Sequence, residues 1–295
     1  MTTDTTQIHN IGYRNYEGRR LGRAYARRSL YSQSLRGAYG LGRSAKSKVL
    51  PMMLLGVMVL TAVVIVAIPM AAGNAMTDLP VEYTSLAMYM QLVIALFLAA
   101  QAPQSVSRDL RFKTVPLYFS RPIERVDYVL SKYAAMASAL FILTALPLLI
   151  LYVGALLAKF DFTDQTKGFV QGLVSVALLS VLFAGIGLVM AALTPRRGFG
   201  VAAVIAVLTI SYGAVSIVQA IAHGTENPDA IQWLGLFSPL SLISGVQSAF
   251  LGAATTFPGG EGPSAGMGAV YVLVVLGLIC GSYAVLMRRY RKAGL

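Results

Sequence analysis

The side chains best suited to recognising another molecule gather in one charged segment, Ser107–Lys132, which lies between two long apolar runs. Guanidinium and carboxylate groups alternate there with aromatic residues and two prolines. The residues that we expect to contact a partner are Arg108, Asp109, Arg111, Thr114, Leu117, Tyr118, Arg121, Pro122, Glu124, Arg125 and Asp127. Apolar and aromatic groups bordered by arginine are typical of protein–protein interfaces. The composition of this segment therefore predicts that it binds another molecule.

The same segment predicts two consecutive helices. Pro116 is acceptable in a first helical turn, so a short helix exposing Leu117–Phe119 starts there and ends before Pro122. Pro122 opens a second helix, which acidic residues near its start favour and which continues through Lys132 into the next apolar run. Two interpretations stay open. Either the apolar stub enters a cleft of a partner protein, or the segment is a hairpin at the membrane surface that only anchors the following span.

Catalytic and metal chemistry is poorly supported. The chain has one cysteine, Cys280, and two histidines, His9 and His223, far apart in sequence. Residues 40–47 approach the phosphate-binding pattern GxxxxGK[ST], but Ala45 replaces the second glycine and no buried strand precedes it. We therefore expect no catalytic residue, no metal and no cofactor in this chain, and a membrane enzyme is the least supported function.

Two stripes of uncharged polar residues lie inside apolar runs. Their members are Gln91 and Gln101 in one run and Thr209, Tyr212, Ser216 and Gln219 in another. The spacing places each set near one helical face. Such groups are costly in lipid, so both faces should turn inward. Two interpretations of these polar residues stay open: they line a substrate pathway, or they only hold the helices together by hydrogen bonds. With no fixed charge along it, such a pathway suits an amphiphilic or apolar substrate.

The elements that must position these groups are membrane helices. Hydrophobic residues make up 56% of the 295, and charged residues 12%, against about 25% in soluble domains. Runs of about 20 apolar residues can cross a bilayer. We expect six spans: Val49–Ala72, Ser85–Ala102, Tyr133–Leu157, Phe169–Leu193, Phe199–Ala222 and Gly266–Met287. None carries an ionisable Asp, Glu, Lys, Arg or His, which argues against a proton-coupled carrier.

The basic residues predict the orientation. All of the 24 Lys and Arg residues except Lys159 and Lys167 fall in the termini or in loops that alternate to one side, so both termini should be cytoplasmic. The number of spans must then be even, so the fairly apolar residues 229–252 cannot be a further span. We expect them to form two short re-entrant helices on the outer side, the second capped by Ser238 with Pro239 in its first turn.

This layout divides the chain into three parts. They are a basic cytoplasmic region, 1–48, a transmembrane domain, 49–287, and a cytoplasmic tail, 288–295. Within the first part, arginines beside a tyrosine and leucine stripe over 11–36 predict an amphipathic helix at an anionic membrane surface. A solvated basic tail is the alternative.

The charged segment resembles the cytoplasmic loop of type-2 ABC (ABC-2) transporter permeases. The matching positions are Arg108, Asp109, Arg111, Thr114, Leu117, Ser120, Arg121, Pro122, Arg125, Asp127, Tyr128 and Lys132. The six-span all-α layout, the basic N-terminal helix and the Ser238–Ser241 element are also similar. The chain departs from the family pattern at Lys113 and Pro116.

The resemblance implies a bacterial plasma-membrane permease that works as a pair, with an identical or paralogous second copy. Two separate ATP-binding subunits would carry ATP and Mg²⁺, and the 107–132 loop would supply the coupling helix docked on them. Such transporters often export their substrate. The competing hypothesis is an autonomous secondary carrier or channel, which needs no ATPase.

Overall fold

A computed structural model describes residues 18, 21–72, 76, 78–112, 123–194, 197–260 and 262–293. Within these ranges the chain forms helices and no strand. In order they are α1 (Arg23–Ala38), α2 (Ala45–Ala72), α3 (Leu86–Tyr89), α4 (Gln91–Ser105), α5 (Ser107–Arg111), α7 (Arg125–Leu157), α8 (Phe162–Leu193), α9 (Arg197–Ile205), the π-helix η2 (Ala206–Ile210), α10 (Ser211–Gly224), α11 (Pro228–Leu234), the 3₁₀ turn η3 (Gly235–Phe237), α12 (Pro239–Phe250) and α13 (Ala265–Ala293). The all-helical class is therefore confirmed for the described residues.

Five helices are long and apolar enough to cross a membrane: α2, α7, α8, the continuous run 198–224, and α13. The remaining expected span, Ser85–Ala102, is divided between α3 and α4, with a break at Met90. The 15 residues of α4 reach only about 22 Å, short of the roughly 30 Å of a bilayer core. The count of six spans thus stays a prediction.

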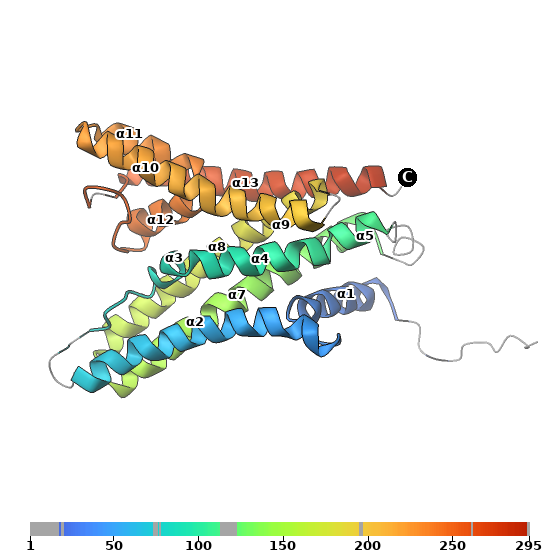
Figure 1. The fold of residues 1–295 in the computed structure, drawn as a ribbon, viewed down its shortest axis with the longest axis horizontal. Helices are drawn as coiled ribbons and strands as arrows, with labels where there is room; N and C mark the ends of the chain where they lie inside the picture. Colours follow the sequence, from blue (N-terminus) through green and yellow to red (C-terminus); the bar gives the residue numbers. More distant parts are fainter. Residues whose placement is uncertain are drawn as a thin grey trace, which may run out of the picture.

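The antiparallel pair α7 and α8 forms the centre of the bundle (Figure 1). Helices α1 and α2 pack against α7, α13 packs against α8, and α4 packs against α8 and α9. Each of these helices has a most apolar stretch of 18 residues. In α8, 67% of that stretch is buried, whereas in the 198–224 run 17% is buried. The interior is therefore built around α8, whereas 198–224 leaves most of its apolar surface uncovered.

Small residues allow the central helices to approach closely. A Cβ added at Gly187 of α8 would lie 2.6 Å from Leu98 of α4, and one at Gly154 of α7 would lie 2.4 Å from Val66 of α2. Both distances are too short for a real contact, so these glycines are required by the packing.

The two short helices expected over 229–252 are present. Asn227 Oδ1 accepts from the Ala230 N–H at 3.1 Å and caps α11, and Ser238 Oγ accepts from the Ser241 N–H and caps α12. Pro228 and Pro239 each occupy a first helical turn. Their depth relative to the outer leaflet stays a prediction.

The start of α1, helix α5 and the end of α13 lie at the same end of the bundle (Figure 1), which we call the basic end. Helix α1 is packed rather than loose, because Tyr31 O–H bonds to Ser138 Oγ at 2.9 Å and Tyr39 O–H donates to the Ala139 carbonyl at 2.7 Å. Helices α2 and α13 extend beyond the expected limits of the transmembrane domain, to Ala45 and Ala293.

The contact between α12 and α13 yields a stability prediction. A Cβ at Gly245 would lie 2.3 Å from the Tyr271 ring, whereas one at Gly56 of α2 meets nothing within 4 Å. We expect Gly245→Ala to lower the free energy of unfolding by about 1–3 kcal/mol relative to Gly56→Ala, since overpacking costs that much. Thermal unfolding of both variants in one detergent measures this. Equal midpoints would contradict the packing of α12 on α13.

Candidate functional site

The structure describes the two flanks of the Ser107–Lys132 segment. One flank is α5 with Phe112, and the other is Ile123 with the start of α7. Residues 113–122 lie outside the described residues, so the short apolar helix stays a prediction, and so do the roles of Thr114, Leu117, Tyr118, Arg121 and Pro122. The side chains of Arg108 and Arg111 also lie outside the description.

Helix α7 starts at Arg125, three residues after the Pro122 start that the sequence predicts. The preceding residue, Glu124, is extended and acts as N-cap, and its N–H donates to Asp127 Oδ2 at 3.3 Å. This bond satisfies a backbone donor that the helix itself leaves free, which explains the later start. From there α7 continues for 33 residues to Leu157, about 50 Å. The predicted continuity from Lys132 into the third span is confirmed.

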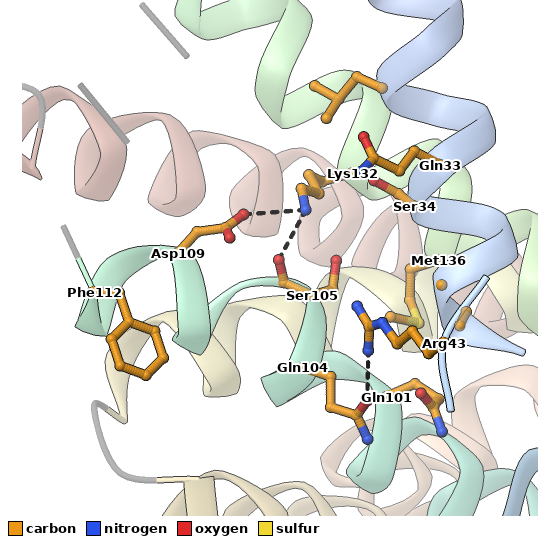
Figure 2. Close-up of a pocket in the computed structure, with 13 residues that line it drawn as sticks. Gln33, Ser34, Arg43, Gln101, Gln104, Ser105, Asp109, Phe112, Lys132 and Met136 are labelled. Carbon is orange, nitrogen blue, oxygen red and sulfur yellow. Dashed lines mark hydrogen bonds and ion pairs between the residues drawn. The ribbon is translucent and has the colours of Figure 1, made fainter. Parts of the chain in front are cut away.

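A group of polar side chains joins the two flanks, and we call it the anchor cluster: Ser105, Asp109, Tyr128 and Lys132. Lys132 Nζ lies 3.1 Å from Asp109 Oδ2 and donates to the Ser105 carbonyl at 3.0 Å (Figure 2). Tyr128 O–H donates to the same Asp109 oxygen at 2.5 Å. The side chains of Lys132 and Asp109 are only 11% and 17% exposed. Charge-assisted bonds of this kind, with little water to screen them, hold α5 against α7.

A second group ties α1 to the start of α7. Arg23 donates to Glu124 Oε2 at 2.8 Å and to Asp127 Oδ2 at 2.5 Å, and Arg27 lies 3.7 Å from the other oxygen of Asp127. The hydrogen bond to Asp127 raises the pKa of the Arg23 guanidinium. The Asp127 side chain is 3% exposed. Asp127 therefore positions α7, and it is not open to a partner protein as its sequence position suggested.

A groove of about 900 Å³ lies beside the end of the charged segment, between the start of α7 and the last turns of α13. Its lining residues are Ile123, Glu124, Arg125, Val126, Ala284, Met287, Arg288 and Arg291. Glu124 and Arg125 were expected at a binding site from sequence. The α13 residues were not, although the basic run 288–292 was a signal for them. Three arginines against one glutamate make the groove electropositive.

The polar residues proposed for a pathway do not form one set. Gln101 is 3% exposed and lines a cavity at the basic end with residues of α1, α5 and α7. Gln219 donates to the Ile231 carbonyl of α11 at 2.8 Å, which fits the alternative that it holds helices together. No hydrogen bond between described residues joins the α4 members to the α10 members.

The other pathway positions are less enclosed. Gln91, Thr209, Tyr212 and Ser216 are all partly exposed. Thr209 lies in the π-helix η2, where each turn takes more residues than in an α-helix. The expected stripe assumed α-helical spacing, and η2 interrupts that spacing at Thr209.

The described ranges show no gathering of ligating side chains. Within them, His, Cys, Asp and Glu form no group of three that could hold a metal ion.

Comparison with known proteins identifies one family. A family model described as "ABC-2 family transporter protein" matches residues 52–252, which is 201 of the 295 residues. The matched range contains the charged segment, the anchor cluster and α12, and excludes α1 and α13. A comparison with curated proteins found no match.

The anchor cluster yields a prediction for coupling between two residues. Lys132→Met should lower the free energy of unfolding by about 1–3 kcal/mol, because it leaves a largely buried carboxylate without its cation. Combined with Asp109→Asn, the double-mutant cycle should give a coupling energy of about 0.5–3 kcal/mol. Unfolding in mixed micelles measures both values.

Lys167→Met is the matched control, because Lys167 is exposed and forms no ion pair within the described residues. We expect it to change stability by less than about 0.5 kcal/mol. Additive effects of the Lys132 and Asp109 substitutions would show that the two groups do not act together.

Proposed function

We propose, from the premise that this chain belongs to the ABC-2 transporter family, that it is the membrane subunit of an ATP-driven transporter whose energy comes from separate ATP-binding subunits. The chain itself is a multi-pass membrane permease. ATP and Mg²⁺ would be held by the partner subunits, and the segment 107–132 would receive the mechanical change that ATP binding produces.

The anchor cluster is the observation that carries this proposal. Residues 113–122 connect α5 to α7 in the chain, and the Asp109–Lys132 pair at 3.1 Å holds these two helices together. A displacement of the segment therefore moves the start of α7 directly. Because α7 is continuous to Leu157, the displacement reaches the opposite side of the bundle.

The partner's docking surface would combine residues 113–122 with the neighbouring groove. The groove begins at Ile123, where the segment ends, and its arginines from α7 and α13 would attract acidic groups on the partner. Arg125, Arg288 and Arg291 would thus add to the contacts of Tyr118 and Arg121. The link between Arg23 and Glu124 extends the connection to α1.

The remaining features of the proposal concern topology and substrate. The basic end would face the cytoplasm of a bacterium, with residues 85–105 as the second of six spans and both termini inside. The exposed apolar surface of 198–224 would face a second permease copy, identical or paralogous, and lipid. Partly buried Tyr212 and Ser216 would border a pathway for an amphiphilic or apolar exported substrate.

Substitutions in the segment test the coupling. We expect Tyr118→Ala and Arg121→Ala each to lower recovery of the ATP-binding subunit about tenfold when the tagged chain is purified from its native membrane, because a central aromatic or arginine contact contributes about 1–2 kcal/mol or more. Membrane insertion should be unchanged. Full recovery with both variants, or transport by the chain alone in proteoliposomes, would favour an autonomous carrier or channel.

Charge reversal in the groove tests the docking surface separately. Arg288→Glu with Arg291→Glu should slow association with the ATP-binding subunit at low salt and flatten or reverse its decline with added salt, since salt screens the attraction that the arginines provide. Lys159→Glu with Lys167→Glu makes the same charge change in the opposite loops and should have no effect. Association rates in detergent provide the measurement, and equal rates for the two double variants would rule the groove out.

A further inference from the structure

A polar cavity of about 280 Å³ lies behind the anchor cluster, enclosed by α1, α4, α5 and α7 (Figure 2). This volume is large beside the roughly 30 Å³ that one water occupies in the liquid. Side chains from all four helices line it, among them Gln33, Arg43, Gln101, Gln104 and Lys132. The assigned family and the proposed docking surface give this cavity no role.

Gln101 is the first indication of a ligand. Its side chain belongs to a residue that is 3% exposed, and it lines the cavity from the middle of α4. It makes no hydrogen bond with any residue that the structure describes, so its amide is open to the cavity. A polar group inside the cavity would provide the missing partner.

The charges lining the cavity indicate the sign of that ligand. The Lys132 ammonium is offset by Asp109 at 3.1 Å. Arg43 donates only to the neutral amide oxygen of Gln104 at 3.0 Å and forms no ion pair within the described residues. The lining thus holds one positive charge without a counter-charge, and this charge lies on a guanidinium, which binds phosphate or carboxylate oxygens well.

A second hollow continues from the first along the other side of α1. It measures about 610 Å³ and is lined by Tyr25, Arg28, Ser29, Ser32, Gln33, Arg36, Gly37, Leu41, Gly42 and Arg43. Gln33, Gly37 and Arg43 line both hollows. Among the described residues no acidic one lines the second hollow, and Arg28, Arg36 and Arg43 give it three guanidinium groups. An anion is therefore attracted to the place where the inner cavity begins.

We propose that these two hollows together bind a phosphate group, with Arg43 and Gln101 donating to its oxygens in the inner cavity and Arg28 and Arg36 drawing it in from the surface. Clustered cations with hydroxyls and amides at the membrane surface suit the headgroup of an anionic phospholipid. A free phosphate in solution offers the same oxygens. The site is distinct from the docking surface, because its two hollows share no lining residue with the groove.

Ligand-dependent stability tests the proposal on the delipidated full chain. The thermal midpoint is compared in phosphatidylcholine nanodiscs, in nanodiscs that also contain phosphatidylglycerol, and in detergent with increasing inorganic phosphate. A ligand that binds only the folded chain raises the midpoint. A rise with phosphatidylglycerol alone identifies a lipid headgroup, and a rise with inorganic phosphate identifies a free phosphate.

Two variants test whether the rise in the thermal midpoint comes from binding at this site. Gln101→Leu keeps the approximate size of the side chain, and Arg43→Gln keeps a hydrogen-bonding side chain but removes its charge. Each should weaken the response at least tenfold in ligand concentration. Lys167→Gln, which removes a distant cation, should respond as the unmodified chain does. Absence of any rise, or an equal rise in Gln101→Leu, would overturn the proposal and leave only general attraction between basic residues and anions.

A labelling experiment covers the case in which a variant folds poorly. Ser34 lines the inner cavity, so Ser34→Cys in a Cys280→Ser background places a single thiol there. Phosphatidylglycerol or inorganic phosphate should slow the reaction of this thiol with a maleimide several-fold. A thiol at Ser29→Cys, which lines the second hollow and not the first, shows in the same way whether the bound group also covers that hollow. An unchanged rate at both positions would count against occupancy of either hollow.

Discussion

The ion pair between Asp109 and Lys132, at 3.1 Å and largely shielded from water, is the contact on which the basic end of this permease depends. The pair joins α5 and α7, the helices on either side of residues 113–122 in the chain. Lys132 also donates to the Ser105 carbonyl, and Tyr128 shares the Asp109 oxygen. Each charge thus has several partners, which offsets the cost of removing it from water.

The consequence is a continuous path of rigid contacts. Asp109 holds α5 to α7, Arg23 holds α1 to the first turn of α7, and α7 extends without interruption to Leu157. A single helix therefore extends from the basic end to the opposite end of the bundle. Its neighbour α8 packs along it and is the most buried of the long helices, so the two helices form one closely packed unit.

The polar groups at the basic end have two kinds of partner. Asp109, Asp127 and Lys132 find theirs inside the chain, which fixes the helices. Arg43, Arg288 and Arg291 line hollows at the same end of the bundle. The side chains that fix the geometry and those that line the hollows come from separate parts of the sequence and meet at this end.

Composition and local spacing alone determined the helical membrane class, the helix that runs from Lys132 into the apolar span, and the cap at Ser238, because each of these depends on residues within a few turns of one another. The tertiary structure decided the rest. The sequence assigned Asp127 to a partner, but it is buried against Arg23, about a hundred residues away. Gln101 and Gln219 looked alike, yet one faces a cavity and the other bonds to α11. Those outcomes depend on which helix faces meet across the bundle, and neither periodicity nor charge counting specifies that.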